Sequence, residues 1–258
     1  MIVTDENTPA GIDKTRPSIA RVYDYWLGGK DNFESDREMG SRMAEVNPAL
    51  PQLVRHNREF ICAAAAGIGQ FLDLGSGLPA HPAVHEAARA VIPDARVCYV
   101  DIDPVAVRHG EVLLARGEGL AAVRADLTDP ETVLANSQVR AVIDLSRPVA
   151  VILAAVVHFL PPDAAAAVCA GYMSRAPSGS WLIVSSGHYE DEELGRRVQQ
   201  AGTYARFHNH DAANLGSMLG DLELVAPGVC EARSWVAGTG GEPAGRPVYA
   251  LAAVGVKS

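Results

Sequence analysis

The chain has 258 residues, of which 31 are acidic and 22 are basic, giving a formal net charge of −9. This acidic balance argues against a polynucleotide as the main partner, because binding phosphates requires a basic face. Hydrophobic residues make up 48% of the chain, enough for a substantial core, which excludes global disorder. No apolar run approaches the roughly 18 residues needed to span a bilayer, so no membrane association is expected.

The N-terminus and the cysteines bear on the location of the protein. The first 17 residues carry acids and a proline and lack an apolar segment, so we predict no secretory signal and a cytoplasmic protein. Scattered thiols in such a protein are usually buried. No disulfide or metal site is therefore expected at the four cysteines, which lie far apart: Cys62, Cys98, Cys169 and Cys230.

The N-terminal part of the chain is predicted to be helical. Residues 1–17 read as a mobile arm, and apolar residues at helical spacing then predict three helices, about 19–27, 35–46 and 51–66, the first capped by Ser18. Residues 18–66 are too few to bury a good core alone, and each helix carries a single apolar stripe. We therefore predict that they form a helical cover packed on a main domain, residues 67–258.

The main domain is predicted to be an α/β, doubly wound sheet. Short apolar runs typical of buried strands occupy 70–75, 95–101, 120–126, 148–155 and 180–186. Helical segments at 81–91, 104–116, 130–136 and 162–175 separate them, which implies parallel strands with right-handed crossovers. Helices at about 190–202 and 210–220 follow. Two last runs, 222–235 and 246–257, have no helix predicted between them and should pair antiparallel, giving seven strands, six parallel and one antiparallel.

A glycine turn closes the first predicted strand. Gly75, Ser76 and Gly77 would allow a tight turn and close approach of a ligand, and continuing to Ala80 gives G-x-G-x-x-A, which also fits a dinucleotide fingerprint. Asp73 favours a different ligand from a dinucleotide. Its carboxylate would repel a pyrophosphate and would attract a ligand that carries an ammonium and a sulfonium, such as S-adenosylmethionine (SAM). The structural alternative is that Asp73 only caps the following turn or helix.

Acids also end the second and third predicted strands. Asp101 can accept hydrogen bonds from both ribose hydroxyls of a nucleoside, whereas Asp103 is predicted to cap the next helix. Asp126 could accept the exocyclic amine of adenine, helped by the Leu127 backbone, or could instead cap a helix before Pro130. Three acids at the ends of three consecutive strands are far more specific than any one alone.

These motifs resemble those of class I SAM-dependent methyltransferases: DLGSG, VDIDP, RADL and VILAAVVHFL in succession. More narrowly, YDYWLGGKDNF, RHNREF, QFLDLGSGLP, VHEAAR and VCYVDIDP resemble a bacterial methyltransferase family first catalogued as a domain of unknown function, over about residues 15–255. The resemblance implies a Rossmann-like fold and SAM as cofactor. It places Ala154 and Ala155 near the methionine part of SAM and counts Ile102 among the cofactor-binding residues. Ile102 and Ala80 stand where a polar residue would be expected.

Candidate catalytic residues are weaker. His158, after the fourth strand, is either a general base or a core residue between strand and helix, and the second interpretation is preferred. Tyr23 and Asn32 lie in the aromatic, glycine-rich segment 23–33, YDYWLGGKDNF. We predict that this segment lies over the crevice and contacts the cofactor or the acceptor. The alternative is that Tyr23 only belongs to the hydrophobic core. His188, His208 and His210 are similar isolated candidates for a catalytic role. No metal site is predicted, because no third ligand accompanies His208 and His210.

The function predicted from these residues is SAM-dependent methyl transfer to a small-molecule acceptor by in-line displacement. A strong base is optional, since SAM is already activated by its sulfonium charge. Two alternatives remain open at this stage: a non-catalytic SAM-binding regulatory protein and, less favoured, an NAD-dependent oxidoreductase. The sequence names neither the acceptor nor the oligomeric state.

Overall fold

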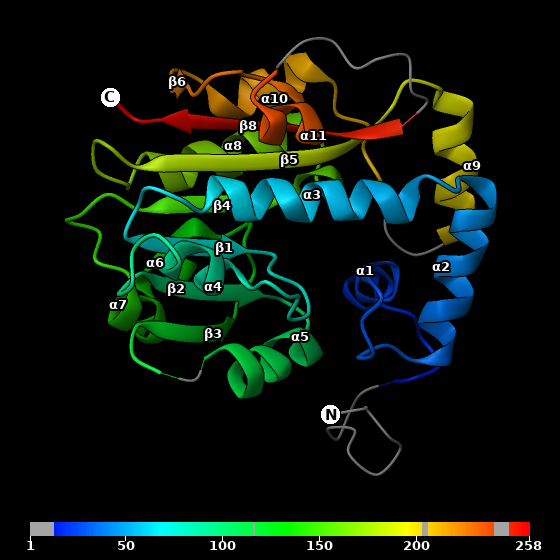
Figure 1. The fold of residues 1–258 in the computed structure, drawn as a ribbon, viewed down its shortest axis with the longest axis horizontal. Coiled ribbons are helices and arrows are strands. Elements are labelled where there is room, and N and C mark those ends of the chain that lie inside the picture. The colour runs from blue at the N-terminus through cyan, green and yellow to red at the C-terminus, as the bar shows by residue number, and fades with distance from the viewer. Residues whose placement is uncertain (1–12, 116, 203–205, 240–247) are drawn as a thin grey trace.

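A central sheet organises the molecule (Figure 1), seen in a computed structural model that describes residues 13–115, 117–202, 206–239 and 248–258. The strand order is β3-β2-β1-β4-β5-β8-β6, with β7 paired to β8. β1 to β5 are parallel, as predicted, and β8 is antiparallel to its neighbours. The strands are β1 (Gln70–Leu74), β2 (Arg96–Asp101), β3 (Leu120–Arg124), β4 (Ala150–Ala154), β5 (Trp181–Tyr189), β6 (Glu223–Leu224), β7 (Cys230–Glu231) and β8 (Val248–Val256).

The strand count corrects the prediction, because the sheet has eight strands instead of seven. The run 222–235 is divided into β6, β7 and the helix α11 (Ala232–Ala237), so the expected absence of a helix before the last strand was also wrong. Pro227 and Gly228 explain the division. Proline has no amide hydrogen for a strand ladder, and the Gly228 amide donates instead to Val225 in a turn. Both short strands nevertheless pair antiparallel with β8, as predicted for the two runs.

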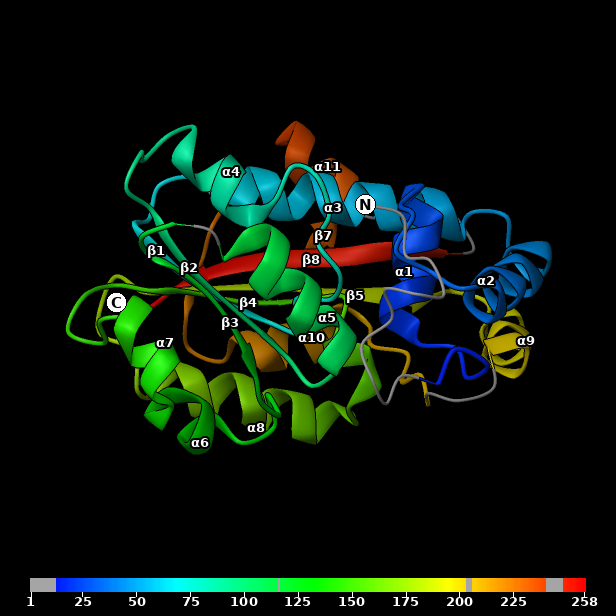
Figure 2. The same ribbon diagram turned by 90° about the horizontal axis from the view of Figure 1, so that it is seen from below.

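Helices cover both faces of the sheet (Figure 2). On one face lie α3 (Leu50–Ala64), α4 (Val84–Arg89) and α11, and their apolar side chains pack around Phe71, Val97 and Ile152. The other face carries α6 (Pro130–Ala135), α7 (Ser137–Val142), α8 (Pro162–Met173) and α10 (Ala212–Leu219). β1, β2, β4 and β5 are thus buried on both sides over most of their length, which is why their sequences read as apolar runs, whereas the edge strand β3 is only partly buried.

Two helical predictions need adjustment. The predicted helix 104–116 is α5 (Pro104–His109) continued by one π-helical turn, η2 (Gly110–Leu114), and residue 116 lies outside the described part. α7 was not predicted; Asn136 separates it from α6 and caps it by accepting a hydrogen bond from Gln138 N at 2.8 Å. Asparagine at such a position ends one helix and begins the next, because its side chain replaces the missing backbone partner.

A third group of helices stands at one end of the sheet. α1 (Ile19–Leu27), α2 (Glu34–Val46) and α9 (Glu192–Gly202) share a separate apolar cluster that includes Val22, Met39 and Val198 (Figure 2). α3 joins this cluster through Leu50 and Val54, while its later residues pack on the sheet. The predicted mobile arm falls largely on residues 1–12, which lie outside the described part. Among the described residues, no helix is long and apolar enough to cross a membrane.

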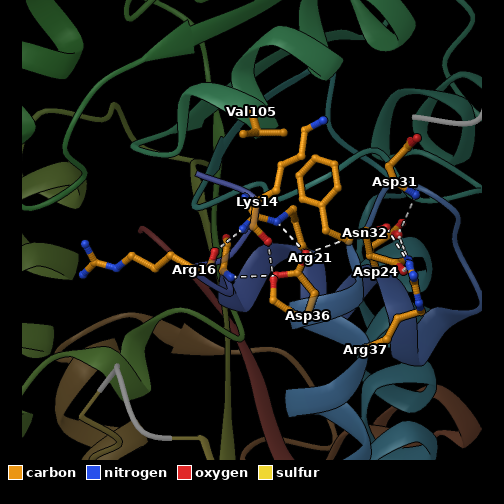
Figure 3. Close-up of polar contacts among 12 residues, drawn as sticks. Lys14, Arg16, Arg21, Asp24, Asp31, Asn32, Asp36, Arg37 and Val105 are labelled. Atoms are coloured by element: carbon orange, nitrogen blue, oxygen red, sulfur yellow. Dashed lines mark hydrogen bonds and ion pairs between the residues drawn. The ribbon is translucent and has the colours of Figure 1, made fainter. Parts of the chain in front are cut away.

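A buried ion pair fixes the start of α1 to α2 (Figure 3). Arg21 Nε lies 2.7 Å from Asp36 Oδ2, and the two side chains are 5% and 0% exposed. Asp36 also accepts hydrogen bonds from the amides of Ser18 and Phe33, both at 2.8 Å. A buried carboxylate needs this many donors, so Asp36 holds the two helix starts in one arrangement.

Candidate active site

A cavity of about 600 Å³ lies at the carboxyl ends of β1 to β4, between the sheet and α1. Ligands bind at this edge in doubly wound folds, because the strand order reverses there and leaves a crevice. All of the predicted cofactor residues except Asn32 line this cavity: Tyr23, Asp73, Gly75, Ser76, Gly77, Asp101, Ile102, Asp126, Leu127, Ala154 and Ala155. The residues predicted from the sequence therefore lie together around one cavity, and the tertiary structure decides what each of them contacts.

The glycine turn after β1 is held by the neighbouring strand. The amides of Gly75 and Ser76 both donate to Val100 O, at 2.8 and 3.1 Å. A Cβ on Gly75 would lie 2.6 Å from Val156 Cγ2, so the close approach of the loop after β4 requires glycine here. A Cβ on Gly77 would meet nothing within 4 Å, which leaves open space on the cavity side of the turn.

Asp101 ties the turn to the end of β2. Its Oδ2 accepts from Gly77 N and its Oδ1 from Asp103 N, both at 2.8 Å. Burial raises the pKa of Asp101, and these backbone hydrogen bonds oppose the rise. Each carboxylate oxygen keeps a further lone pair for a ligand hydroxyl. Asp103 is the cap of α5, as predicted, and accepts from Val105 N at 2.8 Å.

Asp73 is a buried carboxylate in the floor of the cavity. It is 7% exposed, and no described residue donates a hydrogen bond to it. Burial raises its pKa to about 7, with a smaller raising effect from Asp101 and a lowering effect from Arg58. A buried carboxyl group without donors is costly to ionise, and a cationic group placed beside it would lower that cost. The alternative that Asp73 merely caps the turn finds no cap hydrogen bond in the described structure.

Asp126 lies at the rim, after β3. It is exposed, and its Oδ1 accepts from the amide and hydroxyl of Thr128 at 2.9 and 2.7 Å. The cap of α6 is Asp129, which accepts from Thr132 N at 3.1 Å, so the alternative of Asp126 as that helix cap is wrong. Its second carboxylate oxygen remains available beside Leu127 in the cavity wall.

The end of β4 is joined to the cover by a chain of hydrogen bonds. Ala155 has a positive φ of 55°, and its amide donates to Ser185 O at 3.0 Å and Ser185 Oγ at 3.1 Å. Ser185 Oγ donates to Asn57 Oδ1, and Asn57 Nδ2 donates to Tyr23 Oη at 2.9 Å. A non-glycine residue at positive φ is strained and persists only when its surroundings hold it there.

The two weak catalytic candidates are poor bases. Burial raises the pKa of Tyr23, so its phenol is neutral at physiological pH. Burial lowers the pKa of His158 to about 3, and its ring stacks against Phe159 and Phe207 with centroid distances of 4.4 and 4.9 Å. His158 Nδ1 accepts from Gly187 N at 3.3 Å. This arrangement matches the preferred structural interpretation of His158, which lies outside the cavity described above.

Asn32 is placed differently from the prediction. It is buried beside the cavity, where its Nδ2 donates to Asp24 Oδ2 at 2.8 Å and to Gly29 O at 3.1 Å (Figure 3). Asp24, not Asn32, reaches the cavity wall. A Cβ on Gly29 would lie 1.9 Å from Asp24 Oδ1, so this glycine is required for the loop to close over Asp24. Asn32 therefore supports a cavity residue from behind.

Asp24 and Ser18 also line the cavity, and neither was predicted to do so from the sequence. Asp24 stands in the unusual aromatic string next to Tyr23, and that position was the available signal. Ser18 was predicted to cap α1; it occupies the cap position, but its side chain makes no cap hydrogen bond. Its Oγ donates instead to Asp103 Oδ2 at 2.8 Å, 85 residues along the chain. No sequence pattern reveals such a long-range contact.

The charges around the cavity favour a cationic ligand. Among its described lining residues, two arginines, Arg16 and Arg58, face five carboxylates: Asp24, Asp73, Asp101, Asp103 and Asp126. A pyrophosphate would be repelled by this set, whereas an ammonium and a sulfonium would be attracted. The described residues contain no group of three or more His, Cys, Asp or Glu side chains that could hold a metal ion.

The family follows from a comparison with known proteins. The sequence profile of a family described as S-adenosyl methyltransferase matches residues 5–258, nearly the whole chain. The chain belongs to this S-adenosyl methyltransferase family. This confirms the predicted class I SAM-dependent methyltransferase, of a family first catalogued as a domain of unknown function.

Two solved structures are close relatives of this S-adenosyl methyltransferase. A proposed methyltransferase from Thermobifida fusca YX shares 37% identity, covers 98% of this chain and 99% of its own, and superposes with a TM-score of 0.86. A DUF574 family protein from Streptomyces avermitilis MA-4680 shares 34% identity over 95% of this chain and 99% of its own, also with a TM-score of 0.86. No curated protein matches the chain.

A more distant structure extends the likeness of fold alone. The N-methyltransferase NodS from Bradyrhizobium japonicum WM9, solved with S-adenosyl-L-homocysteine, is 12% identical, covers 95% of this chain and 99% of its own, and has a TM-score of 0.51. The Rossmann-like fold class is thus confirmed, apart from the strand count.

The S-adenosyl methyltransferase is an enzyme that uses SAM as its cofactor and transfers a methyl group. The regulatory and NAD-dependent alternatives are therefore set aside. The residues that line the cavity are compatible with SAM. Asp73 is a buried carboxylate that a cationic group would stabilise, Gly77 leaves open space, and Asp101 has lone pairs that can accept hydrogen bonds. The acceptor is not identified by the family.

Proposed function

We propose that this methyltransferase acts on a small-molecule acceptor, inside a site closed by its N-terminal helices. The observation that carries this proposal is the hydrogen bond of 2.8 Å between Ser18 and Asp103, which draws the start of α1 across the end of β2. Residues along the whole length of α1, from Ile19 to Leu27, line the cavity. A macromolecular acceptor would have to displace this cover, whereas a small molecule can enter beneath it.

The cofactor contacts are proposed residue by residue. Asp101 accepts the ribose hydroxyls, and Ile102, 62% exposed at the cavity, packs against the adenine. Asp126 and the Leu127 backbone take the adenine amine. Gly75, Ser76 and Gly77 form the turn beside the ligand, which leaves the methionine end of SAM toward Asp73.

The methionine end is proposed to lie between opposite charges. Asp73 pairs with the cationic part of SAM, and Arg58 with its carboxylate. Arg58 supports this assignment because its Nε is buried and has no hydrogen-bond partner among the described residues. Ala154 and Ala155 leave room for the methyl group, since side chains of this size fill little of the cavity wall.

The protein would act mainly by positioning. SAM supplies a methyl group on a positively charged sulfur and needs no further activation. Tyr23 and Phe159 exclude water from the region beyond Ala155, and the cover holds the acceptor in line. Neither Tyr23 nor His158 takes a proton at neutral pH, because one phenol stays neutral and the imidazole has its pKa near 3. Neither group therefore acts as the base that removes the acceptor's proton.

The domain division and location complete the proposal. Residues 18–66 are proposed to act as the cover and residues 67–258 as the SAM-binding domain, with the arm 1–17 leading into Ser18. We propose that the enzyme works in a bacterial cytoplasm. Bacterial relatives and four free cysteines support this location. The acidic net charge supports an acceptor other than a nucleic acid.

A labelling experiment tests the size of the acceptor. SAM with a tritiated methyl group is incubated with the enzyme and an extract of a bacterium that carries a relative, such as Streptomyces avermitilis. Ultrafiltration at about 3 kDa retains proteins and nucleic acids and passes ligands small enough for such a pocket, and chromatography then separates the filtered products from unreacted SAM. Enzyme-dependent label is expected in filtered compounds other than SAM. Label retained with protein or nucleic acid would overturn the proposal, and the Asp101→Ala variant, expected to bind the cofactor more weakly, serves as the control.

A further inference from the structure

A second cavity lies beside the proposed cofactor site and is lined differently. It has a volume of about 110 Å³ and lies between α1, α2, α3, α9 and the ends of β4 and β5. Four residues line both cavities, which are therefore neighbours with common walls: Ile19, Tyr23, Ala155 and Phe159. We name this second cavity the inner chamber.

The inner chamber carries no charge on the lining residues that the structure describes. Its polar groups are few. Asn57 is 1% exposed and bonded to Tyr23 and Ser185, and His158 is kept neutral by burial. An unpaired charge in such a place would lose its hydration and gain no partner. The chamber thus selects against ionic molecules, in contrast to the acidic cofactor cavity beside it.

Aromatic rings are concentrated around the same space. The chain has 15 Phe, Trp and Tyr residues in all, and the chamber is lined by five of them: Tyr23, Trp26, Phe159, Tyr189 and Phe207. His158 and Phe207 form a tilted stack, 32° apart, on one wall. Such walls favour a flat ring, because aromatic pairs gain from offset or edge-to-face contact beyond the area they bury.

Packing provides a further reason to expect an occupant. Protein interiors are close-packed and hold few voids larger than a water molecule. The chamber is lined by Met39 and Met43, whose flexible side chains usually fill such gaps. Its persistence next to the cofactor cavity, with the strained Ala155 on the shared wall, points to a space kept for a ligand.

We propose that the inner chamber is the acceptor site and that it takes an uncharged aromatic small molecule. This inference rests on the proposed function, because it places the acceptor beyond Tyr23 and Ala155 from the cofactor. Tyr23 then lies on the shared wall, where its neutral hydroxyl can orient a polar atom of the acceptor. His158 becomes a wall that stacks on the ring and takes no proton.

Three para-substituted phenols whose substituents differ in charge test the selection. p-Cresol is neutral, 4-hydroxybenzoate is anionic and tyramine is cationic at neutral pH. Each is titrated by calorimetry into the enzyme saturated with S-adenosyl-L-homocysteine, so that the cofactor cavity is filled. p-Cresol is expected to bind at least about tenfold more tightly than either ion, because neither ion finds a partner in the chamber. Equal binding of all three, or no binding of p-cresol, would overturn the assignment.

Two variants locate the binding. Met43→Trp should fill the chamber and weaken p-cresol binding about tenfold or more, while S-adenosyl-L-homocysteine binds as before. Glu45→Trp, exposed on the same helix, is the matched control and should change neither. If Met43→Trp fails to fold, the charge series on the unmodified enzyme still decides. Failure of S-adenosyl-L-homocysteine to bind would contradict the proposed function; its binding without p-cresol would contradict only the chamber.

Discussion

Ser18 Oγ donates a hydrogen bond of 2.8 Å to Asp103 Oδ2, and Asp103 in turn caps α5 through Val105 N. One carboxylate thus serves the sheet domain and the cover at once. Asp101, the proposed ribose ligand, accepts a hydrogen bond from Asp103 N, so the Ser18 contact is linked to the proposed ribose site through Asp103. The position of α1 is therefore coupled to the loop that is proposed to hold the cofactor.

Removing this contact should loosen the cover. Ser18→Ala is expected to weaken S-adenosyl-L-homocysteine binding by about 0.5–1.5 kcal/mol, the usual net value of one hydrogen bond. Calorimetry measures the affinity, and hydrogen exchange should show less protection of residues 23–33 by the ligand. Ser41→Ala is the control, since Ser41 bonds only Tyr25 within the cover. An unchanged affinity for Ser18→Ala would mean that the cover does not affect the cofactor.

Asp101 should recognise the part of SAM that adenosine shares. Asp101→Asn is expected to weaken SAM and adenosine alike, by roughly 2–3 kcal/mol, as when a charged hydrogen-bond partner is lost. Asp129→Asn, which alters the exposed cap of α6, should leave both affinities unchanged. A loss confined to SAM would place Asp101 away from the ribose.

Asp73 should make the stability of the ligand-free enzyme depend on pH. Its pKa is raised to about 7 by burial, whereas an unfolded aspartate titrates near about 3.9. Between these values the folded state holds a proton that the unfolded state has lost, so the free energy of unfolding falls as pH rises from about 4 to 7. Urea unfolding at several pH values should show a smaller fall for Asp73→Asn. Asp94→Asn, at the opposite edge of the sheet, is the control and should behave like the wild type.

The same carboxyl group should link SAM binding to protons. A cationic ligand favours ionised Asp73, so SAM is expected to bind more tightly at pH 8 than at pH 6 and to release a proton on binding at pH 6. Calorimetry in two buffers of different ionisation enthalpy measures that proton. Adenosine, which lacks the cationic end, should show no such dependence, and Asp73→Asn should abolish it for SAM. The same pH dependence for both ligands would assign the effect to another group.

The Arg21–Asp36 pair should dominate the stability of the cover. Asp36→Ala leaves Arg21 buried without its partner and removes the acceptor of two amides, so we expect a loss of about 3–5 kcal/mol in the free energy of unfolding. Chemical denaturation measures the loss. Glu38→Ala, exposed on the same helix, should change stability by less than about 0.5 kcal/mol. A small effect of Asp36→Ala would show that apolar packing alone holds α1 on α2.

The parallel core of the sheet was predictable because each strand is local. β1 to β5 are short, mostly apolar runs, and the acids at the ends of the first three mark one edge of the sheet. The last strands were less predictable. β6 and β7 each have two residues and exist only because β8 offers a long edge to pair with, which no local pattern encodes.

The sequence by itself determined the fold class, the cofactor edge and the residues gathered there, because strand alternation and a glycine turn bring Asp73, Asp101 and Asp126 together. The tertiary structure decided what depends on contacts between distant segments. Asp24, not the predicted Asn32, lines the cavity wall. Ser18 donates a hydrogen bond to Asp103 instead of capping α1, and burial lowers the pKa of His158 to about 3. Burial and long-range hydrogen bonds set these roles, and both arise only when the chain is packed.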